Sequence, residues 1–93
     1  MREKTLESKL VEAVRIMGGI CPKLTSPGNG GMPDRLVLLP GGRMAFIEVK
    51  GHGMQPRPLQ LRRHGMLRRL GFMVFILDDV EQIGGILSEI QSP

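Results

Sequence analysis

The sequence predicts one α/β domain, in which helices cover both faces of a sheet in the order α-β-β-β-α-β-α. Two observations favour this fold class. Residues 34–50 form two apolar runs around a Pro-Gly-Gly turn, and a hairpin that is apolar on both faces belongs in the middle of a covered sheet. Residues 72–77 form a continuous apolar run, which is typical of a buried strand. A chain of 93 residues has the length of a single domain.

The first predicted element is a helix over about residues 3–17. Its apolar residues recur three and four positions apart, which produces one apolar stripe, and Gly18–Gly19 ends the helix. Residues 20–25 are a weak strand candidate. Residues 26–33 are rich in Gly and Pro and predict a loop. The glycines of this loop allow a tight turn, or a close approach of the backbone to a phosphate, before Asp34.

The central hairpin has a predictable register. Strands are expected at residues 34–39 and 43–50. The proline that starts the turn between them has no N–H to donate to a ladder, so we place it in a three-residue loop, residues 40–42. Leu39 then opposes Arg43.

In this register, three charged side chains converge at the open end of the hairpin. Asp34 falls opposite Glu48. Glu48 and Lys50 lie on one face because side chains along a strand repeat every two residues. The alternative is that the strand simply ends in water, where Glu48 and Lys50 would be solvated.

The remaining chain predicts a helix, a strand and a second helix. Proline is tolerated in a first helical turn, so a helix is expected over about residues 58–70. The apolar run at residues 72–77 is the next strand. A last helix, capped by Asp78 or Asp79, is expected to reach about Ile90.

Composition excludes several classes of function. The single Cys cannot form an internal disulfide or a thiolate zinc site, and two His without a Cys or His at ligand spacing do not suggest one. Cys21 is expected to be a small buried apolar residue. The absence of Trp and Tyr argues against stacking on bases. No apolar run approaches the length of a membrane span, and the first residues do not resemble a signal peptide, so we expect a cytoplasmic protein without membrane contact.

The positive charge of the chain is concentrated in one segment. The net charge is +4, from 13 Lys and Arg against 9 Asp and Glu. No acidic residue lies between Val49 and Leu77, whereas six basic residues do: Lys50, Arg57, Arg62, Arg63, Arg68 and Arg69. Such a segment favours a polyanionic partner, most commonly nucleic acid. A solvated helix face is the alternative interpretation.

The converging charges indicate a site for phosphodiester hydrolysis. Two neighbouring carboxylates repel each other unless a cation lies between them. Hard divalent cations such as Mg2+ bind oxygen ligands, often one or two protein carboxylates and water. Lys50 could orient or help deprotonate an attacking water, or stabilise charge that develops on a phosphate. Asp34 and Glu48 are therefore candidate metal ligands.

These residues resemble a known signature. Pro33-Asp34, followed after 13 residues by Glu48-Val49-Lys50, resembles the PD-(D/E)XK nuclease motif. The predicted order resembles the αβββαβ core of restriction-endonuclease-like proteins, which have a mixed central sheet flanked by helices. More narrowly, about residues 3–80 resemble a VRR-NUC (virus-type replication–repair nuclease) domain of the stand-alone phage type, so residues 1–93 are expected to form a single domain of this kind. The likeness also includes Glu7, Gly30–Asp34, Phe46–Lys50 and Gln60.

The resemblance implies roles for individual residues. Asp34, Glu48 and the backbone carbonyl of Val49 would bind Mg2+, for which Mn2+ could substitute. Lys50 would be the catalytic lysine, and the enzyme would be an endodeoxyribonuclease.

Two further residues complete the implied site. Glu7, on the first helix, would complete the metal site directly or through water, with Glu3 and Glu12 as rivals if the helix faces another way. An ordinary surface ion pair is the alternative for Glu7. Gln60 matches a helix glutamine that lies near the metal waters and the phosphate, with a solvated residue as its alternative.

DNA is the expected partner. Phosphates would be bound by Arg57, Arg62, Arg63, Arg68 and Arg69, and His52 could add a contact from its loop. No base-reading helix is evident, which favours recognition of DNA shape, such as a branch or a Holliday junction, in replication, recombination or repair. The family's resemblance to junction resolvases implies a homodimer. A non-catalytic DNA-binding module and a basic protein-interaction domain remain as alternatives.

Overall fold

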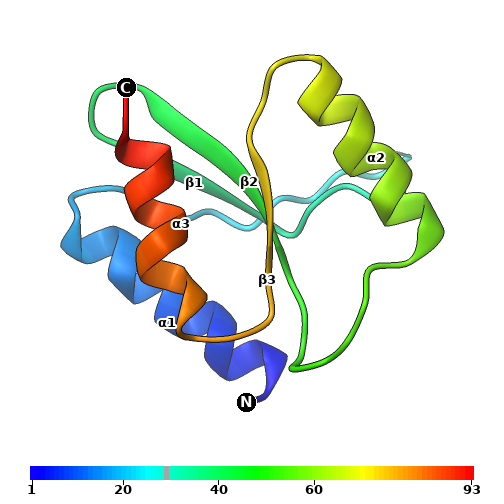
Figure 1. Cartoon of the computed structure of the whole chain (residues 1–93), viewed down its shortest axis with the longest axis horizontal. Coiled ribbons are helices and arrows are strands. Elements are labelled where there is room, and N and C mark those ends of the chain that lie inside the picture. Colours follow the sequence, from blue (N-terminus) through cyan, green and yellow to red (C-terminus); the bar gives the residue numbers. More distant parts are fainter. Residues whose placement is uncertain (29) are drawn as a thin grey trace.

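A computed structural model describes residues 1–28 and 30–93. Three helices and three strands follow one another along the chain (Figure 1): α1 (Glu3–Ile16), β1 (Arg35–Leu39), β2 (Arg43–Val49), α2 (Pro58–Arg69), β3 (Val74–Leu77) and α3 (Gln82–Gln91). The strands form one sheet in the order β1-β2-β3. β1 is antiparallel and β3 is parallel to the central strand β2, so the predicted mixed sheet is confirmed.

The predicted hairpin register is confirmed. Leu39 pairs with Arg43, and Arg35 pairs with Ile47, so the loop consists of residues 40–42. Its two glycines have φ angles of 85° and 75°, a left-handed conformation that glycine adopts without steric cost. The register that follows from the proline alone therefore sets the whole hairpin.

One face of the sheet carries the hydrophobic core. Val37, Ala45 and Ile47 point to this face and are fully buried. They pack with apolar side chains of α1 and α3, which lie on the same side of the sheet in Figure 1. Cys21 belongs to this core, as expected, and burial raises the pKa of its thiol to about 11. The spacing of apolar residues in α1 is thus explained by one buried stripe.

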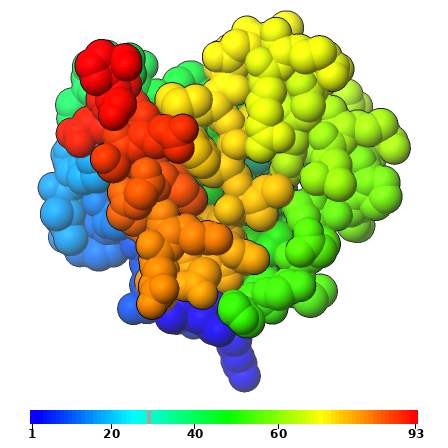
Figure 2. Space-filling view, viewed as in Figure 1, coloured from blue at the N-terminus to red at the C-terminus, as the bar shows by residue number. Residues whose placement is uncertain are grey.

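The other face is covered by α2 and is only partly closed. No residue of α2 belongs to the buried apolar cluster. Leu36, Leu38 and Met44, which alternate with the core residues, are half-buried. Figure 2 shows α3 and α2 on either side of the β3 segment. The two faces of the sheet therefore differ in how completely they are covered.

The strand expected at residues 20–25 forms only isolated bridges. Ile20 bridges Leu38 and Lys23 bridges Arg35, both antiparallel, so the sheet has three regular strands among the described residues. The segment still lies along β1, and Leu36 N donates to Pro22 O at 3.0 Å. Pro22 has no N–H for a continuous ladder, which explains why the pairing is interrupted.

The predicted boundaries near the C-terminus need correction. β3 begins at Val74, two residues after the predicted start, because Gly71 has a φ of 99° and turns the chain after α2. The cap of α3 is Glu81, so neither Asp78 nor Asp79 caps the helix. Asp79 Oδ1 instead accepts a bond from Glu81 N at 2.9 Å, which closes the turn before the helix.

A membrane-spanning segment was not expected. Within the described residues, none of the helices combines the length and the hydropathy that a membrane crossing requires.

Candidate active site

The predicted charges do converge at the open end of the hairpin. Asp34 Oδ2 accepts a hydrogen bond from the backbone N–H of Val49 at 2.9 Å, which ties the start of β1 to the end of β2. Lys50 N donates to Leu77 O at 2.9 Å and extends the pairing with β3. The Lys50 ammonium lies 3.6 Å from Glu48 Oε2. Hydrogen bonds on both sides of β2 therefore fix the backbone positions from which the side chains of Glu48 and Lys50 project.

Glu48 is buried, with 1% of its surface exposed. Its contacts come from α2, where Gln60 Nε2 donates to Glu48 Oε2 at 3.1 Å. His64 Nε2 lies 3.5 Å from Glu48 Oε1. The strand does not end in water at Glu48, and Gln60 is buried, so the alternative interpretations that placed Glu48 and Gln60 in solvent are wrong.

Gln60 is held from its other end. Its Oε1 accepts a bond from the backbone N–H of Arg57 at 2.7 Å, in the first turn of α2. This bond closes the helix N-terminus, where backbone N–H groups lack partners within the helix. It also fixes the amide so that its Nε2 points at Glu48. Gln60 thereby joins the start of α2 to the carboxylate pair.

The electrostatics of the pair favour a cation. The pKa of Glu48 is raised to about 8, first by burial and then by the hydrogen bond and the negative charge of Asp34, while Lys50 acts in the lowering direction. Two carboxylates this close cannot both ionise cheaply unless positive charge lies beside them. Burial lowers the pKa of His64, and the charge of Arg68 adds to that effect. Neutral histidine does not supply the missing positive charge.

The available oxygen ligands fit a hard divalent ion that takes only a few of its ligands from the protein. Within residues 1–28 and 30–93, no three His, Cys, Asp or Glu side chains form a group that could hold a metal. The available set is the carboxylate pair of Asp34 and Glu48, and Mg2+ is often held by one or two carboxylates and waters. Glu48 Oε1 is buried without a hydrogen-bond partner among the described atoms, so it has lone pairs to offer.

Glu7 lies apart from this pair. Its Oε1 accepts a bond from Arg35 Nε at 2.7 Å, and Arg35 also donates to Cys21 O at 2.9 Å. Because side chains alternate along β1, Arg35 points to the α1 face of the sheet, whereas Asp34 points to the α2 face. The described contacts place Glu7 beside Arg35 and not against Glu48. The rival Glu12 pairs with Arg15 on the exposed face of α1.

The loop before Asp34 is fastened to α2. Arg63 Nε donates to Gly30 O at 3.0 Å. Gly31 has a φ of 82°, and a Cβ there would lie 2.8 Å from Leu59 O. The chain therefore turns at Gly31, as one of the two expectations for these glycines had it, and Gly31 lies against the first turn of α2.

The residues predicted to bind DNA lie on α2 and on the loop before it, and three of their side chains contact other residues. Arg63 holds the loop, and Arg68 donates to Val74 O at 2.8 Å, at the start of β3. His52 is exposed and its Nδ1 lies 3.8 Å from Asp79 Oδ2. The others are exposed: Arg57, Arg62 and Arg69.

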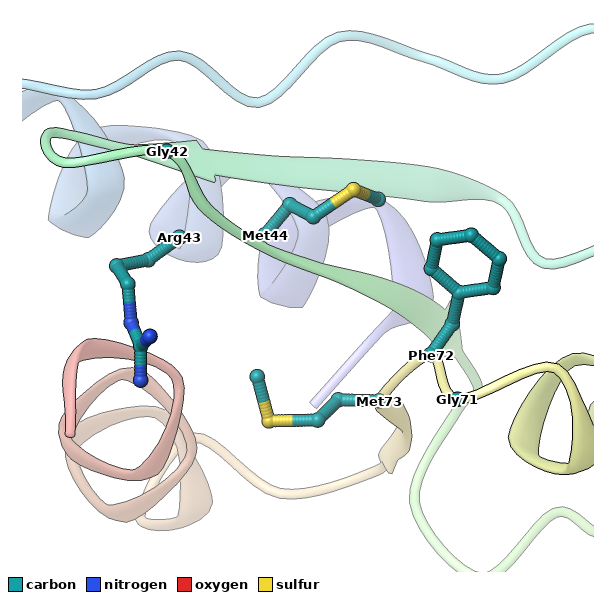
Figure 3. A pocket seen from close by; sticks show the side chains of 6 residues that line it. All are labelled: Gly42, Arg43, Met44, Gly71, Phe72 and Met73. Atoms are coloured by element: carbon teal, nitrogen blue, oxygen red, sulfur yellow. The ribbon is translucent and has the colours of Figure 1, made fainter. Parts of the chain in front are cut away.

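The pocket in Figure 3 is not this site. It is lined at the other end of β2 by Arg43 and Met44, with their neighbour Gly42, and by residues 71–73 after α2. Arg43 Nε donates to Ile90 O at 3.2 Å, which fixes one wall to α3. Glu48 is four residues from Met44, about 13 Å along an extended strand. None of the predicted site residues lines the pocket.

Sequence reasoning missed His64 and Arg35. His64 is fully buried against Glu48, although it has no partner at metal-ligand spacing in the sequence. A signal was present, because His64 follows Gln60 by four residues and so shares its helix face. Arg35 showed no comparable signal, since its partner Glu7 is 28 residues away in the chain.

Comparison with known proteins identifies the fold and the family. No family model matches the chain. A solved structure described as a VRR_NUC domain superposes with a TM-score of 0.88 at 34% identity, over 95% of this chain and 96% of that one. The fold is therefore that of a VRR-NUC domain.

A relative is also found in a phage. The chain is 46% identical over 90 residues to "Putative nuclease p44" of Acyrthosiphon pisum secondary endosymbiont phage 1, which covers 97% of this chain and 96% of the relative. Together with the structural match, this likeness shows that the chain belongs to the virus-type replication–repair nuclease (VRR-NUC) family, in its phage form.

Proposed function

We propose that this domain is a metal-dependent endonuclease of the PD-(D/E)XK type that hydrolyses DNA phosphodiester bonds. The observation that carries the proposal is the carboxylate pair of Asp34 and Glu48 at the end of the hairpin, with the Lys50 ammonium 3.6 Å from Glu48. A buried carboxylate beside a second one is costly without a cation, and this arrangement supports the proposal of a metal site. The name of the phage relative, a nuclease, agrees with this function.

The proposed roles combine the resemblance to the family with the contacts of the site residues. Asp34, Glu48 and the backbone carbonyl of Val49 would hold Mg2+, with Mn2+ as a substitute. The bound ion would stabilise charge on the phosphate and lower the pKa of a bound water. Lys50 would orient the attacking water or stabilise charge on the phosphate oxygens. Gln60 would hold Glu48 Oε2.

The proposed role of Glu7 is indirect, and Glu7 is not a metal ligand. Its bond to Arg35 lies on the opposite sheet face from Glu48, so its contribution would run through Arg35, the neighbour of Asp34. Holding Arg35 to α1 would fix the backbone at the start of β1. Glu7 is therefore proposed to support the position of Asp34.

The proposed substrate is DNA that is recognised by shape. Exposed Arg57, Arg62 and Arg69 would contact phosphates, and His52, which is also exposed, could add a contact from its loop. Phosphate contacts position DNA without reading its sequence. A branch or a Holliday junction, as arises in replication, recombination or repair, is the proposed target, in the cytoplasm of a bacterial or phage-infected cell.

We further propose that the enzyme acts as a homodimer. Among its described residues, one chain offers one candidate site of this kind, the pair of Asp34 and Glu48, and cutting two strands at a junction takes two such sites. Exposed apolar side chains at Ile20, Leu70 and Phe72 support association. Light scattering at micromolar concentration should give twice the monomer mass, and a mass near 10.3 kDa would contradict the dimer.

A plasmid-nicking assay tests the activity. Wild type, Asp34→Ala and Lys50→Ala are compared in Mg2+, Mn2+ and EDTA, with Glu89→Ala and Lys9→Ala as charge-matched surface controls. Wild type and both controls should nick supercoiled DNA in either metal and stop in EDTA. The two site variants should lose at least about 100-fold in rate, as expected for loss of a group that acts on the transition state.

Other outcomes favour other functions. DNA binding in EDTA without cleavage in any metal, on junctions as well as plasmids, would favour a non-catalytic DNA-binding module. A lack of DNA affinity at moderate salt would favour a protein-interaction domain. Nicking that survives in both site variants would place the activity elsewhere.

A further inference from the structure

The two oxygens of the Glu48 carboxylate have different surroundings. Oε2 accepts a hydrogen bond from Gln60 Nε2 at 3.1 Å and lies 3.6 Å from Lys50 Nζ. Oε1 is buried and has no hydrogen-bond partner among the described atoms. The nitrogen that faces Oε1 is His64 Nε2, at 3.5 Å. One oxygen is held by a bond, and the other has a donor just beyond bonding distance.

His64 is itself a buried polar group without a bond. Its exposed fraction is 0%, and neither ring nitrogen has a partner among the described atoms. Buried polar atoms nearly always have partners, and one left without a partner calls for an explanation. An apolar side chain would fill the same space without that cost. The imidazole therefore points to a polar role toward Glu48.

The helix geometry supports that role. Gln60 and His64 are four residues apart on α2, so both project from the same face. Their side chains meet the two different oxygens of the same carboxylate. A neutral imidazole with its proton on Nε2 can donate to Oε1 after a shift of about half an ångström, since N–H···O bonds have a mode near 3.0 Å. Hydrogen bonds in active sites are often long before a ligand binds.

We infer that His64 is a positioning residue, whose Nε2–H donates to Glu48 Oε1 and fixes the rotation of the carboxylate. Gln60 and His64 then hold Glu48 from two sides, so that its orientation toward Asp34 is set before a metal arrives. The inference rests on the proposed function insofar as Glu48 is a metal ligand. His64 is not proposed to touch the metal or the substrate.

Two substitutions separate this bond from simple packing. His64→Gln retains an amide N–H near the place of Nε2, whereas His64→Leu fills similar space and cannot donate. His64→Phe is a second variant without a donor, closer in shape to imidazole, in case the leucine variant does not fold. Leu61→Gln, on the exposed side of α2, is the control.

The readouts are the Glu48 conformer in metal-free crystals, Mn2+ affinity by calorimetry, and nicking. Wild type, Leu61→Gln and His64→Gln should show one Glu48 conformer and similar Mn2+ affinity. The variants without a donor should show a rotated or multiple Glu48 conformer and bind Mn2+ at least about 10-fold more weakly, the usual cost of losing a partner that orients a metal ligand.

Each contrary result has a distinct meaning. An unchanged Glu48 conformer in the variants without a donor would overturn the inference. Equal losses in His64→Gln and His64→Leu would show that shape matters and the hydrogen bond does not, which also overturns it. If wild type neither binds Mn2+ nor cuts DNA, the proposed function fails, and the Glu48 conformer in His64→Leu still decides whether His64 positions it.

Discussion

The two faces of the sheet bury different kinds of side chain. On the face that carries α1 and α3 (Figure 1), Val37, Ala45 and Ile47 are fully buried in the hydrophobic core. On the α2 face, the most deeply buried groups include Glu48, Gln60 and His64. Apolar burial stabilises the fold, whereas a buried carboxylate opposes it. The comparison teaches that one sheet carries the apolar core on one face and the candidate active site on the other.

The largest expected effect comes from the apolar face. Leu10 is fully buried in the core, so Leu10→Ala should lower the free energy of unfolding by about 2–5 kcal/mol, through lost apolar contact and a residual cavity. Urea unfolding measures this loss, and the exposed neighbour Lys9→Ala should change stability by less than about 0.5 kcal/mol. A comparable loss in both variants would break the contrast between the faces.

On the α2 face, the buried Glu48 carboxylate should destabilise the metal-free protein when it is charged. The pKa of Glu48 is raised from 4.5 to about 8 in the folded protein, so the folded state binds this proton more tightly than the unfolded state. The stability of metal-free protein should therefore fall as pH rises from about 4.5 to about 8, by about 1.4 kcal/mol for each unit of pKa difference at most.

Glu48→Gln tests whether the Glu48 carboxyl group causes this pH dependence of stability. The variant lacks the titrating group, so its stability should decline less between these pH values than that of wild type, and it should be the more stable protein at pH 9 while nicking no DNA. Urea titrations at several pH values in EDTA measure the difference. Parallel pH curves for the two proteins would show that Glu48 is not destabilised by burial.

A smaller loss is expected where the loop meets α2. Gly31→Ala places a Cβ 2.8 Å from Leu59 O at a positive φ, which should cost about 1–2 kcal/mol and disturb the loop before Asp34. Gly28 also has a positive φ but has nothing within 4 Å of a Cβ, so Gly28→Ala is the matched control for the backbone strain alone. Equal stability of the two variants in urea would show that contact with α2 is unimportant.

The smallest expected effect concerns DNA affinity. Arg62 is exposed on α2, so Arg62→Ala should weaken binding to junction DNA evenly across sequences and reduce the slope of log affinity against log salt by about 1. Arg2→Ala, at the exposed N-terminus, is the control. Fluorescence anisotropy in EDTA over a range of salt concentrations measures both. An unchanged slope would show that Arg62 does not contact the DNA phosphates.

The hairpin was predictable because its information is local. A proline without an N–H sets the turn, the turn sets the register, and the register brings Asp34 to Glu48. The pairing of residues 20–25 was overestimated because an interrupted ladder depends on which N–H groups find acceptors. Glu7 with Arg35, and His64 with Glu48, depend on how helices dock on the sheet. Such docking is decided by packing across the chain: the spacing of four residues puts His64 on the helix face of Gln60, but it does not show that this face meets Glu48, and the pairing of Glu7 with Arg35 has no trace in residue spacing.

The bond from Val49 N to Asp34 Oδ2 also makes one amide proton a sensor of the site. A side-chain oxygen here takes the place of a strand carbonyl, so the protection of that proton against exchange with deuterium depends on a single carboxylate. Asp34→Asn keeps an acceptor oxygen, whereas Asp34→Ala removes it and frees the end of the hairpin to open. Hydrogen exchange at the Val49 amide can thus distinguish loss of the Asp34 charge from local opening of the hairpin, without a DNA-cleavage assay.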